Sequence, residues 1–168
     1  KIMKTDKEYV GEITLGATSN TDDADGIINR FEESAAADDE EPPHLQQIQE
    51  ALKSFMGTYD QMPPQFSAKK VEGRRAYALA RAGKVADLNP VSVTVHELEL
   101  IDYHWPILKV RVVCGKGFYM RSLARDLGAK LGTGGYLSAL VRTHVGQYSL
   151  DQAIVIEQVD QSRIIAIR

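Results

Sequence analysis

The amino-acid sequence predicts an α+β domain in which a mixed, largely antiparallel sheet is flanked by helices. Residues 8–16 and 107–113 alternate apolar and polar side chains, which is typical of strands with one buried face. Apolar residues recur at helical spacing over residues 120–131. Strands and helices follow one another without the regular βαβ alternation that produces an all-parallel sheet.

The first third of the chain is predicted to contain one strand and one helix, separated by polar residues. The strand 8–16 is followed by a polar loop at 17–26. The acidic segment 31–42 has few large apolar residues, and we expect it to be a mobile insertion. Residues 43–56 carry an apolar stripe at helical spacing, and Gly57 is suited to end that helix.

The middle of the chain is predicted to be extended, then briefly helical, then a strand. Residues 61–73 contain two adjacent prolines, which favour an extended backbone. Residues 74–82 are predicted to form a short helix. Over residues 91–100 the apolar side chains change from odd to even positions, and a bulge near His96–Glu97 would reconcile the two halves.

A glycine-rich turn connects the strand 107–113 to the most regular helix of the sequence. That helix covers residues 120–131, and Gly132 is suited to end it. Beyond it we expect a second short helix at 137–141 and a final strand at 146–150.

Composition is that of an ordinary globular domain. The 168 residues suffice for one domain with a sizeable core, and 43% are apolar while 26% are charged. No apolar run approaches the roughly 18 residues of a membrane helix, and the first residues lack the apolar stretch of a signal peptide. We therefore expect no membrane partner. Because Cys114 is the single cysteine, no internal disulfide can form, and we expect a cytoplasmic protein.

The net charge of −3 conceals an uneven distribution. Residues 22–41 carry nine of the 23 acidic side chains and one of the 20 basic ones, which leaves 19 basic against 14 acidic side chains elsewhere. Basic residues concentrate at 67–84 and 109–130. Such segments attract polyanions, although the same pattern also occurs on solvated surfaces that bind nothing.

Arg121 and Arg125 lie four residues apart at the start of the helix 120–131. Like charges at that spacing repel one another, and the helix dipole disfavours a cation in the first turn. A nearby anion would remove both penalties, and the glycine-rich turn before the helix allows backbone N–H groups to approach one. We therefore expect an anion at this helix start, although a plain turn with solvated arginines fits the same residues.

Three longer motifs occur in order between residues 7 and 146. They are "KEYVGEITLGATSNTDDADG", "PPQFSAKKVEGRRAYALARAG", and "KGFYMRSLARDLG" followed by "KLGTGGYLSALVRTHVG". Together they resemble the TruB family of pseudouridine synthases, which act on the T-loop of transfer RNA. The resemblance covers nearly the whole chain, and the motifs are highly specific in this order and spacing.

The resemblance implies an isomerisation that needs no metal and no cofactor. Enzymes of this family detach uracil from C1′ of the ribose, turn the base, and reattach it through C5, at position 55 of the tRNA T-loop. The target base must leave its stack to be reached, and an aromatic pocket receives it. The expected partner is therefore tRNA, bound through its T-arm stem-loop.

The resemblance also implies roles for individual residues. Arg121 would pair with the nucleophilic aspartate, which would be the anion expected at the helix start. Tyr9 would stack on the flipped base, and Tyr119 and Leu140 would line the base pocket. Contacts to the RNA backbone, inferred more loosely from charge, are expected from Lys70, Arg74 and Arg81.

One motif of the family does not occur in the sequence. The nucleophilic aspartate lies in a "G-x-LDP-x-A-x-G" type motif upstream of the residue that corresponds to Tyr9, and no such motif is present. We therefore expect residues 1–168 to be a partial catalytic domain, without the nucleophile segment and without a C-terminal RNA-binding (PUA-type) domain, and inactive by itself. The alternatives are a non-catalytic RNA-binding module of the same fold and an unrelated α+β domain.

No metal site is expected. Residues 21–32 partly match a calcium-binding EF-hand loop, but Thr21 stands where a carboxylate is required. The four histidines do not have the spacing of metal ligands, and a single cysteine does not complete a set with them.

Overall fold

A six-stranded antiparallel sheet organises the molecule. The computed structural model describes residues 5–30, 41–67, 69–71, 74–81, 83 and 86–154. The strand order is β10-β9-β1-β8-β7-β4, and every pairing is antiparallel. The strands are β1 (Lys7–Leu15), β4 (Gly57–Gln61), β7 (Val91–His104), β8 (Ile107–Cys114), β9 (Gly135–Val145) and β10 (Tyr148–Ser149). The predicted fold class, an α+β domain with a largely antiparallel sheet, is confirmed.

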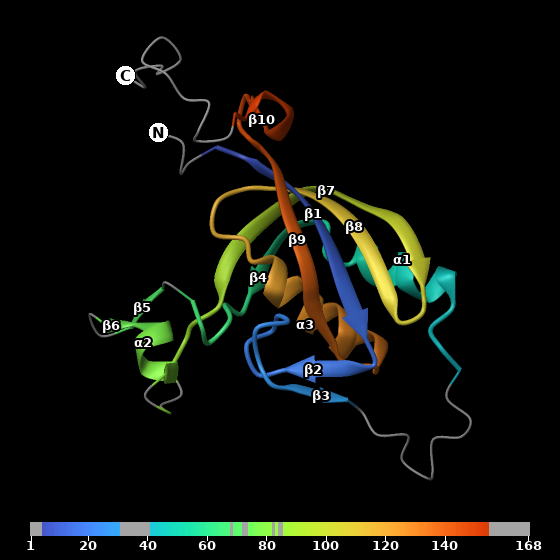
Figure 1. Ribbon diagram of the computed structural model, residues 1–168, viewed down its shortest axis with the longest axis horizontal. Coiled ribbons are helices and arrows are strands. Elements are labelled where there is room, and N and C mark those ends of the chain that lie inside the picture. The colour runs from blue at the N-terminus through green and yellow to red at the C-terminus, as the bar shows by residue number, and fades with distance from the viewer. Residues whose placement is uncertain are drawn as a thin grey trace.

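Two helices lie on the same side of the sheet, behind it in Figure 1. They are α1 (Leu45–Lys53) and α3 (Met120–Leu131). A smaller unit lies apart from the sheet, at the left of Figure 1, and consists of β5 (Lys70–Val71), β6 (Arg74–Arg75) and α2 (Ala76–Arg81). The remaining elements are the hairpin of β2 (Ala17–Ser19) and β3 (Ile28–Arg30) and a 3-10 helix (Leu150–Gln152). None of the described helices has the length and apolarity needed to cross a membrane.

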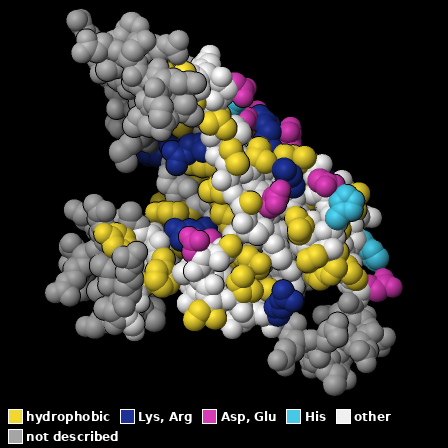
Figure 2. Space-filling view, viewed as in Figure 1, with side chains coloured by type: hydrophobic (Ala, Val, Ile, Leu, Met, Phe, Trp, Pro, Cys, Tyr) yellow, Lys and Arg dark blue, Asp and Glu magenta, His cyan; other side chains and the backbone are white. Residues whose placement is uncertain are grey.

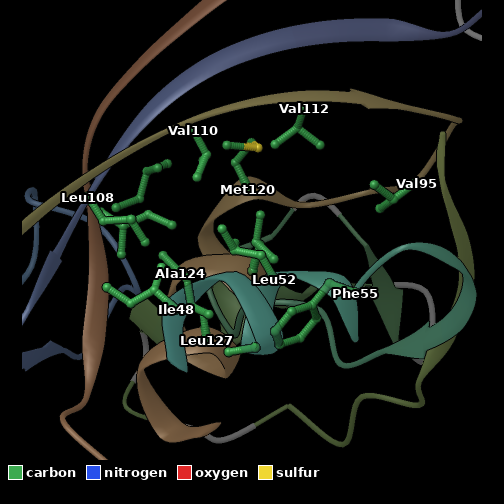
Figure 3. Close-up of a cluster of buried hydrophobic side chains, with 14 of the residues drawn as sticks. Ile48, Leu52, Phe55, Val95, Leu108, Val110, Val112, Met120, Ala124 and Leu127 are labelled. Atoms are coloured by element: carbon green, nitrogen blue, oxygen red, sulfur yellow. The ribbon is translucent and has the colours of Figure 1, made fainter. Parts of the chain in front are cut away.

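The hydrophobic core lies between the sheet and these two helices (Figure 3). Alternate residues of the central strands meet the apolar stripes of α1 and α3, and the fully buried members include Ile13, Ile48, Val110, Leu123 and Leu127. Burying a large aliphatic side chain contributes about 1.5–3 kcal/mol. This packing fixes α3 against the sheet, and it thereby fixes the position of the arginine in the first turn of α3.

The opposite face of the sheet carries charged side chains in cross-strand pairs. Arg111 contacts Glu8 and Glu97, each at 2.7 Å. Glu8 also accepts a hydrogen bond of 2.6 Å from Thr143, and it lies 3.0 Å from Nδ1 of His144. On the surface seen in Figure 2, several Lys and Arg side chains lie directly beside Asp and Glu side chains. Much of the positive charge on this face is therefore neutralised by the chain itself.

The helix predicted at residues 137–141 is wrong. These residues belong to β9, which pairs with β1 from Gly135 opposite Leu15 to Val145 opposite Lys7. Cross-strand pairing outweighs the local helical preference of the leucines and alanine in this segment. The strand predicted at 146–150 is also shorter than expected, because only Tyr148–Ser149 pair with β9.

The other predicted elements agree more closely with the structure. The bulge in β7 is confirmed by a shift of register between Val95 and Glu97. The helix predicted at 74–82 begins only at Ala76, because Arg74–Arg75 pair with β5 as a strand.

The sequence patterns do not predict β4, which pairs with β7 at the edge of the sheet. The predicted acidic insertion at 31–42 falls mainly on residues 31–40, which lie outside the described residues.

Candidate active site

Arg121 lies in the first turn of α3 and binds three groups from two loops. Its Nη1 lies 3.1 Å from Oδ2 of Asp23 and 3.3 Å from the carbonyl oxygen of Thr21, and its Nη2 donates to the carbonyl oxygen of Phe66 at 3.0 Å. The sequence predicts an anion at this helix start, and the structure provides one. This anion is Asp23, and the pairing of Arg121 with a catalytic carboxylate, which the resemblance implies, stays a prediction.

Arg125 forms a second, parallel pair one helical turn further along α3. Its Nη1 lies 3.0 Å from Oδ2 of Asp22, its Nε donates to Asp126 at 2.8 Å, and its Nη2 donates to the carbonyl oxygen of Met62 at 2.9 Å. Burial raises the pKa of Asp22 above its ordinary value, and the nearby guanidinium of Arg125 only partly opposes this effect. Two consecutive aspartates thus neutralise two arginines that would otherwise repel each other.

The turn that holds these aspartates is fixed to the start of β9. The backbone N–H of Leu137 donates to the carbonyl oxygen of Asp22 at 3.0 Å, and the N–H of Ala24 donates to the carbonyl oxygen of Leu137 at 3.1 Å. Within the turn, Oδ1 of Asp23 accepts hydrogen bonds from the hydroxyl of Thr21 at 2.5 Å and from the N–H of Asp25 at 3.2 Å. Both aspartates are therefore engaged by donors of this chain.

A cavity of about 270 Å³ lies between this turn, α3 and β9. Its polar wall contains Asp23, Asp25 and Arg121. The opposite wall is the β9 segment 137–140, which is apolar except for Ser138 and ends at Leu140. The structure therefore brings Arg121 and Leu140, two of the residues singled out by the resemblance, to one cavity.

Tyr9 lies on the same side of the sheet, close to the end of this apolar wall. In the pairing of β1 with β9, Gly11 lies opposite Leu140 and Tyr9 lies opposite Arg142. The guanidinium carbon of Arg142 lies 5.4 Å from the centroid of the Tyr9 ring, which is within cation–π range. Burial raises the pKa of Tyr9, and the nearby charge of Arg142 acts in the opposite direction.

The sequence patterns do not identify Arg142 as a functional residue. It is exposed, and it forms no ion pair with any residue that the structure describes. Arg142 could have been identified from its position two residues after Leu140, because residues two apart on a strand lie on the same face of the sheet. That signal is available only when residues 137–145 are recognised as a strand.

Tyr119 does not line the cavity. It is the N-cap residue of α3, and its backbone is held by the side chain of Gln61, which is buried with 1% exposure. Gln61 accepts from the Tyr119 N–H at 2.9 Å and donates to its carbonyl oxygen at 3.1 Å. This amide thus fixes the backbone immediately before Arg121.

The three basic residues assigned to the RNA backbone are not on the elements that line the cavity. They belong to the smaller unit, with Lys70 in β5, Arg74 in β6 and Arg81 at the end of α2. The unit is connected to the preceding loop by hydrogen bonds from the N–H of Ala76 to Lys69 and from the N–H of Tyr77 to Ser67. Within the described residues, no group of three or more His, Cys, Asp or Glu side chains is arranged to hold a metal ion.

Comparison with known proteins gives matches along nearly the whole chain. Residues 1–120 match the TruB family pseudouridylate synthase N-terminal domain, and residues 121–166 match the tRNA pseudouridylate synthase B C-terminal domain. The tRNA pseudouridine synthase B of Parabacteroides distasonis is 42% identical over 154 residues, which are 92% of this chain and 63% of that protein. The Leifsonia xyli protein of the same name is 46% identical over 157 residues, which are 90% of this chain and 51% of that protein. The chain thus spans 51% to 63% of the length of these relatives.

Solved structures share the fold at low sequence identity. A chain of a Cbf5-Nop10-Gar1 complex gives a TM-score of 0.60 at 22% identity, covering 89% of this chain and 33% of that one. A chain of an H/ACA RNP bound to a substrate RNA containing 2'-deoxyuridine gives a TM-score of 0.57 at 19% identity, covering 92% and 32%. These likenesses support the fold alone. The sequence matches over residues 1–120 and 121–166 show more, namely that the chain belongs to the TruB family of pseudouridine synthases.

Proposed function

We propose that this chain is part of the catalytic domain of a cytoplasmic tRNA pseudouridine synthase that converts the uridine at position 55 of the T-loop. The observation that carries this proposal is the cavity of about 270 Å³ in which Arg121 and Leu140 meet. These residues come from different motifs and from different elements, a helix and a strand. Their convergence beside Tyr9 is what a site for one flipped base requires.

The walls of the cavity suit a base on one side and a charged reaction centre on the other. A flipped uridine would pack against the apolar segment that ends at Leu140, with the ring of Tyr9 available for stacking. Arg142 would bind a phosphate next to the flipped nucleotide, since phosphate contacts position the RNA. Tyr119 would act through the start of α3, which Gln61 holds, and Lys70, Arg74 and Arg81 would contact RNA outside the cavity.

Arg121 retains the capacity to hold a second anion. Its guanidinium carries five N–H donors. Two of them on Nη1 and one on Nη2 bind Asp23, Thr21 and Phe66. Among the described residues, the Nε–H and the second Nη2–H have no hydrogen-bond partner. These two donors would orient the carboxylate that attacks C1′ while the bond from C1′ to N1 of uracil breaks, and no cofactor is needed for that step.

We infer that this attacking carboxylate is not among residues 1–168, because the family motif that would contain it does not occur in this sequence. Asp23 is the carboxylate at Arg121, but both of its oxygens already accept hydrogen bonds within the chain. The isolated 168-residue chain should therefore bind T-arm RNA without converting it. Turnover by this chain with no added polypeptide would contradict the inference.

The proposed function is tested with the complete protein that contains this sequence. Arg121→Ala should reduce single-turnover pseudouridine formation in T-arm RNA by at least about 100-fold, because the anion at the reaction centre loses its partner. The affinity for RNA should change by less than about threefold, since most RNA contacts lie elsewhere. Lys130→Ala is the matched control, because Lys130 is an exposed cation in the last turn of the same helix.

The result also decides between an enzyme and a binding module. A complete protein that binds T-arm RNA tightly but forms no pseudouridine would be a non-catalytic module of the same fold. RNA binding that does not weaken with added salt would contradict both possibilities, because phosphate contacts release counterions.

A further inference from the structure

Arg125 joins the same two segments as Arg121 but lies outside the cavity. Both arginines reach the turn at residues 21–23 and the loop at residues 62–66, one helical turn apart. Arg121 is among the residues that line the cavity, whereas Arg125 and Asp22 are not. The pair of Arg125 with Asp22 is therefore placed behind the pair that faces the cavity.

Asp22 has an unusual backbone conformation. Its φ is 62°, and it is the single non-glycine residue with a positive φ in the part of the chain that the structure describes. Residues other than glycine adopt this region rarely, and they remain there only when the surroundings fix them. Three contacts do so here: the N–H of Asp22 donates to Ser19, its carbonyl oxygen accepts from Leu137, and its carboxylate binds Arg125.

The conformation of Asp22 determines where the next carboxylate points. Asp23 follows directly, and its Oδ2 lies 3.1 Å from Nη1 of Arg121. The carboxylate of Asp22 is itself mostly buried, with 14% exposure, so it needs a charged partner in order to stay there. Without Arg125 the carboxylate would turn towards water, and the strained turn would relax.

We propose that Arg125 is a positioning residue of this site. Through Asp22 and the carbonyl oxygen of Met62, it holds the turn in the strained conformation that aims Asp23 at Arg121. The catalytic part of this inference rests on the proposed function. The structural part, that the contact of Arg121 with Asp23 depends on Arg125, is independent of the proposed function.

The structural part is tested by NMR of the guanidinium groups. The ¹⁵N–¹H signals of Arg121 are assigned as those that disappear in Arg121→Ala. They should shift and broaden in Arg125→Gln and in Asp22→Asn. Asparagine tolerates a positive φ, so Asp22→Asn removes the charge while keeping the turn accessible, and it remains informative if Arg125→Gln does not fold. Lys130→Gln removes the same charge from the same helix and should leave the signals unchanged.

The catalytic part is tested by comparing rate with affinity. In the complete protein, Arg125→Gln and Asp22→Asn should each lower the single-turnover rate by about tenfold, while the dissociation constant for T-arm RNA changes by less than about threefold. The double variant should be no slower than either single variant, because both changes break the same pair.

Two results would overturn the positioning role of Arg125. Arg121 signals that stay in place in both variants would overturn the positioning role, whatever the activity. Signals that move while the rate stays at the wild-type level would show that the pair only stabilises the turn, and would overturn the role as well. If the wild-type complete protein forms no pseudouridine, the proposed function fails, and the NMR result still decides the structural part.

Discussion

Arg142 differs from the two arginines of α3 because no carboxylate of the described residues forms an ion pair with it. Arg121 and Arg125 each pair with an aspartate, whereas the side chain of Tyr9 is the partner that the structure shows for Arg142 among the described residues. An exposed cation of this kind, two residues beyond the cavity wall on β9, is available to a phosphate.

Replacement of Arg142 should therefore weaken RNA binding in a way that depends on salt. Arg142→Gln should reduce the slope of log affinity against log salt concentration by about one, because one phosphate contact is lost. Lys109→Gln is the matched control, since Lys109 lies on the opposite face and is already paired with Glu12 at 3.2 Å. Equal salt slopes for Arg142→Gln and the wild type would show that Arg142 contacts no phosphate.

At the scale of elements, the crossing of α3 and β9 depends on Gly128. A Cβ added at this position would collide with the backbone of Gly134 and Gly135 at the start of β9. Helix propensity alone would favour alanine over glycine by about 1 kcal/mol. The collision is with backbone atoms, which cannot move aside without displacing β9, so we expect it to outweigh that preference.

Gly128→Ala should therefore lower the free energy of unfolding by at least about 2 kcal/mol. Denaturant titration followed by circular dichroism measures the change. Gly115→Ala is the matched control, because the nearest atom to its added Cβ would be 3.7 Å away. A Gly128→Ala variant as stable as the wild type would show that the crossing is looser than the structure indicates.

The elements also show how far the sequence predicts this fold. Helix 120–131 is predicted with its correct ends, because its apolar stripe and Gly132 are local signals. The prediction fails at 137–141, since pairing of β9 with β1 depends on residues more than a hundred positions away. The same applies to the site. The resemblance singles out Arg121 and Leu140, which line one cavity, whereas the contact of Asp23 with Arg121 appears only when the turn is folded against α3.

At the scale of the whole molecule, Glu8 connects three strands of the sheet. Hydrogen bonding from Thr143, and then from Arg111 and His144, lowers the pKa of Glu8 despite the opposing effect of burial. A carboxyl group whose pKa is lower in the folded state contributes stability that is fully present above its unfolded pKa, about 4.3, and is lost as the pH falls through the folded-state value.

Glu8→Gln should therefore lower the free energy of unfolding at neutral pH by about 1–2 kcal/mol. The difference from the wild type should shrink as the pH falls below about 4.3. Glu12→Gln is the control and should cost less than about 1 kcal/mol, because both members of its pair with Lys109 are more than a third exposed. A difference between Glu8→Gln and the wild type that does not vary with pH would contradict the assignment.

The hydrogen bonds between the Gln61 side chain and the Tyr119 backbone connect the edge of the sheet to the helix that carries Arg121. Gln61 is the last residue of β4, an outermost strand held by a single neighbour, and Tyr119 immediately precedes the first turn of α3. Fraying of β4 would release that turn while the interior strands are still paired. On heating, catalytic activity should therefore be lost below the temperature of global unfolding. The amide hydrogen of Tyr119 should exchange with solvent at the rate measured for β4, which is faster than the rate of the central strands.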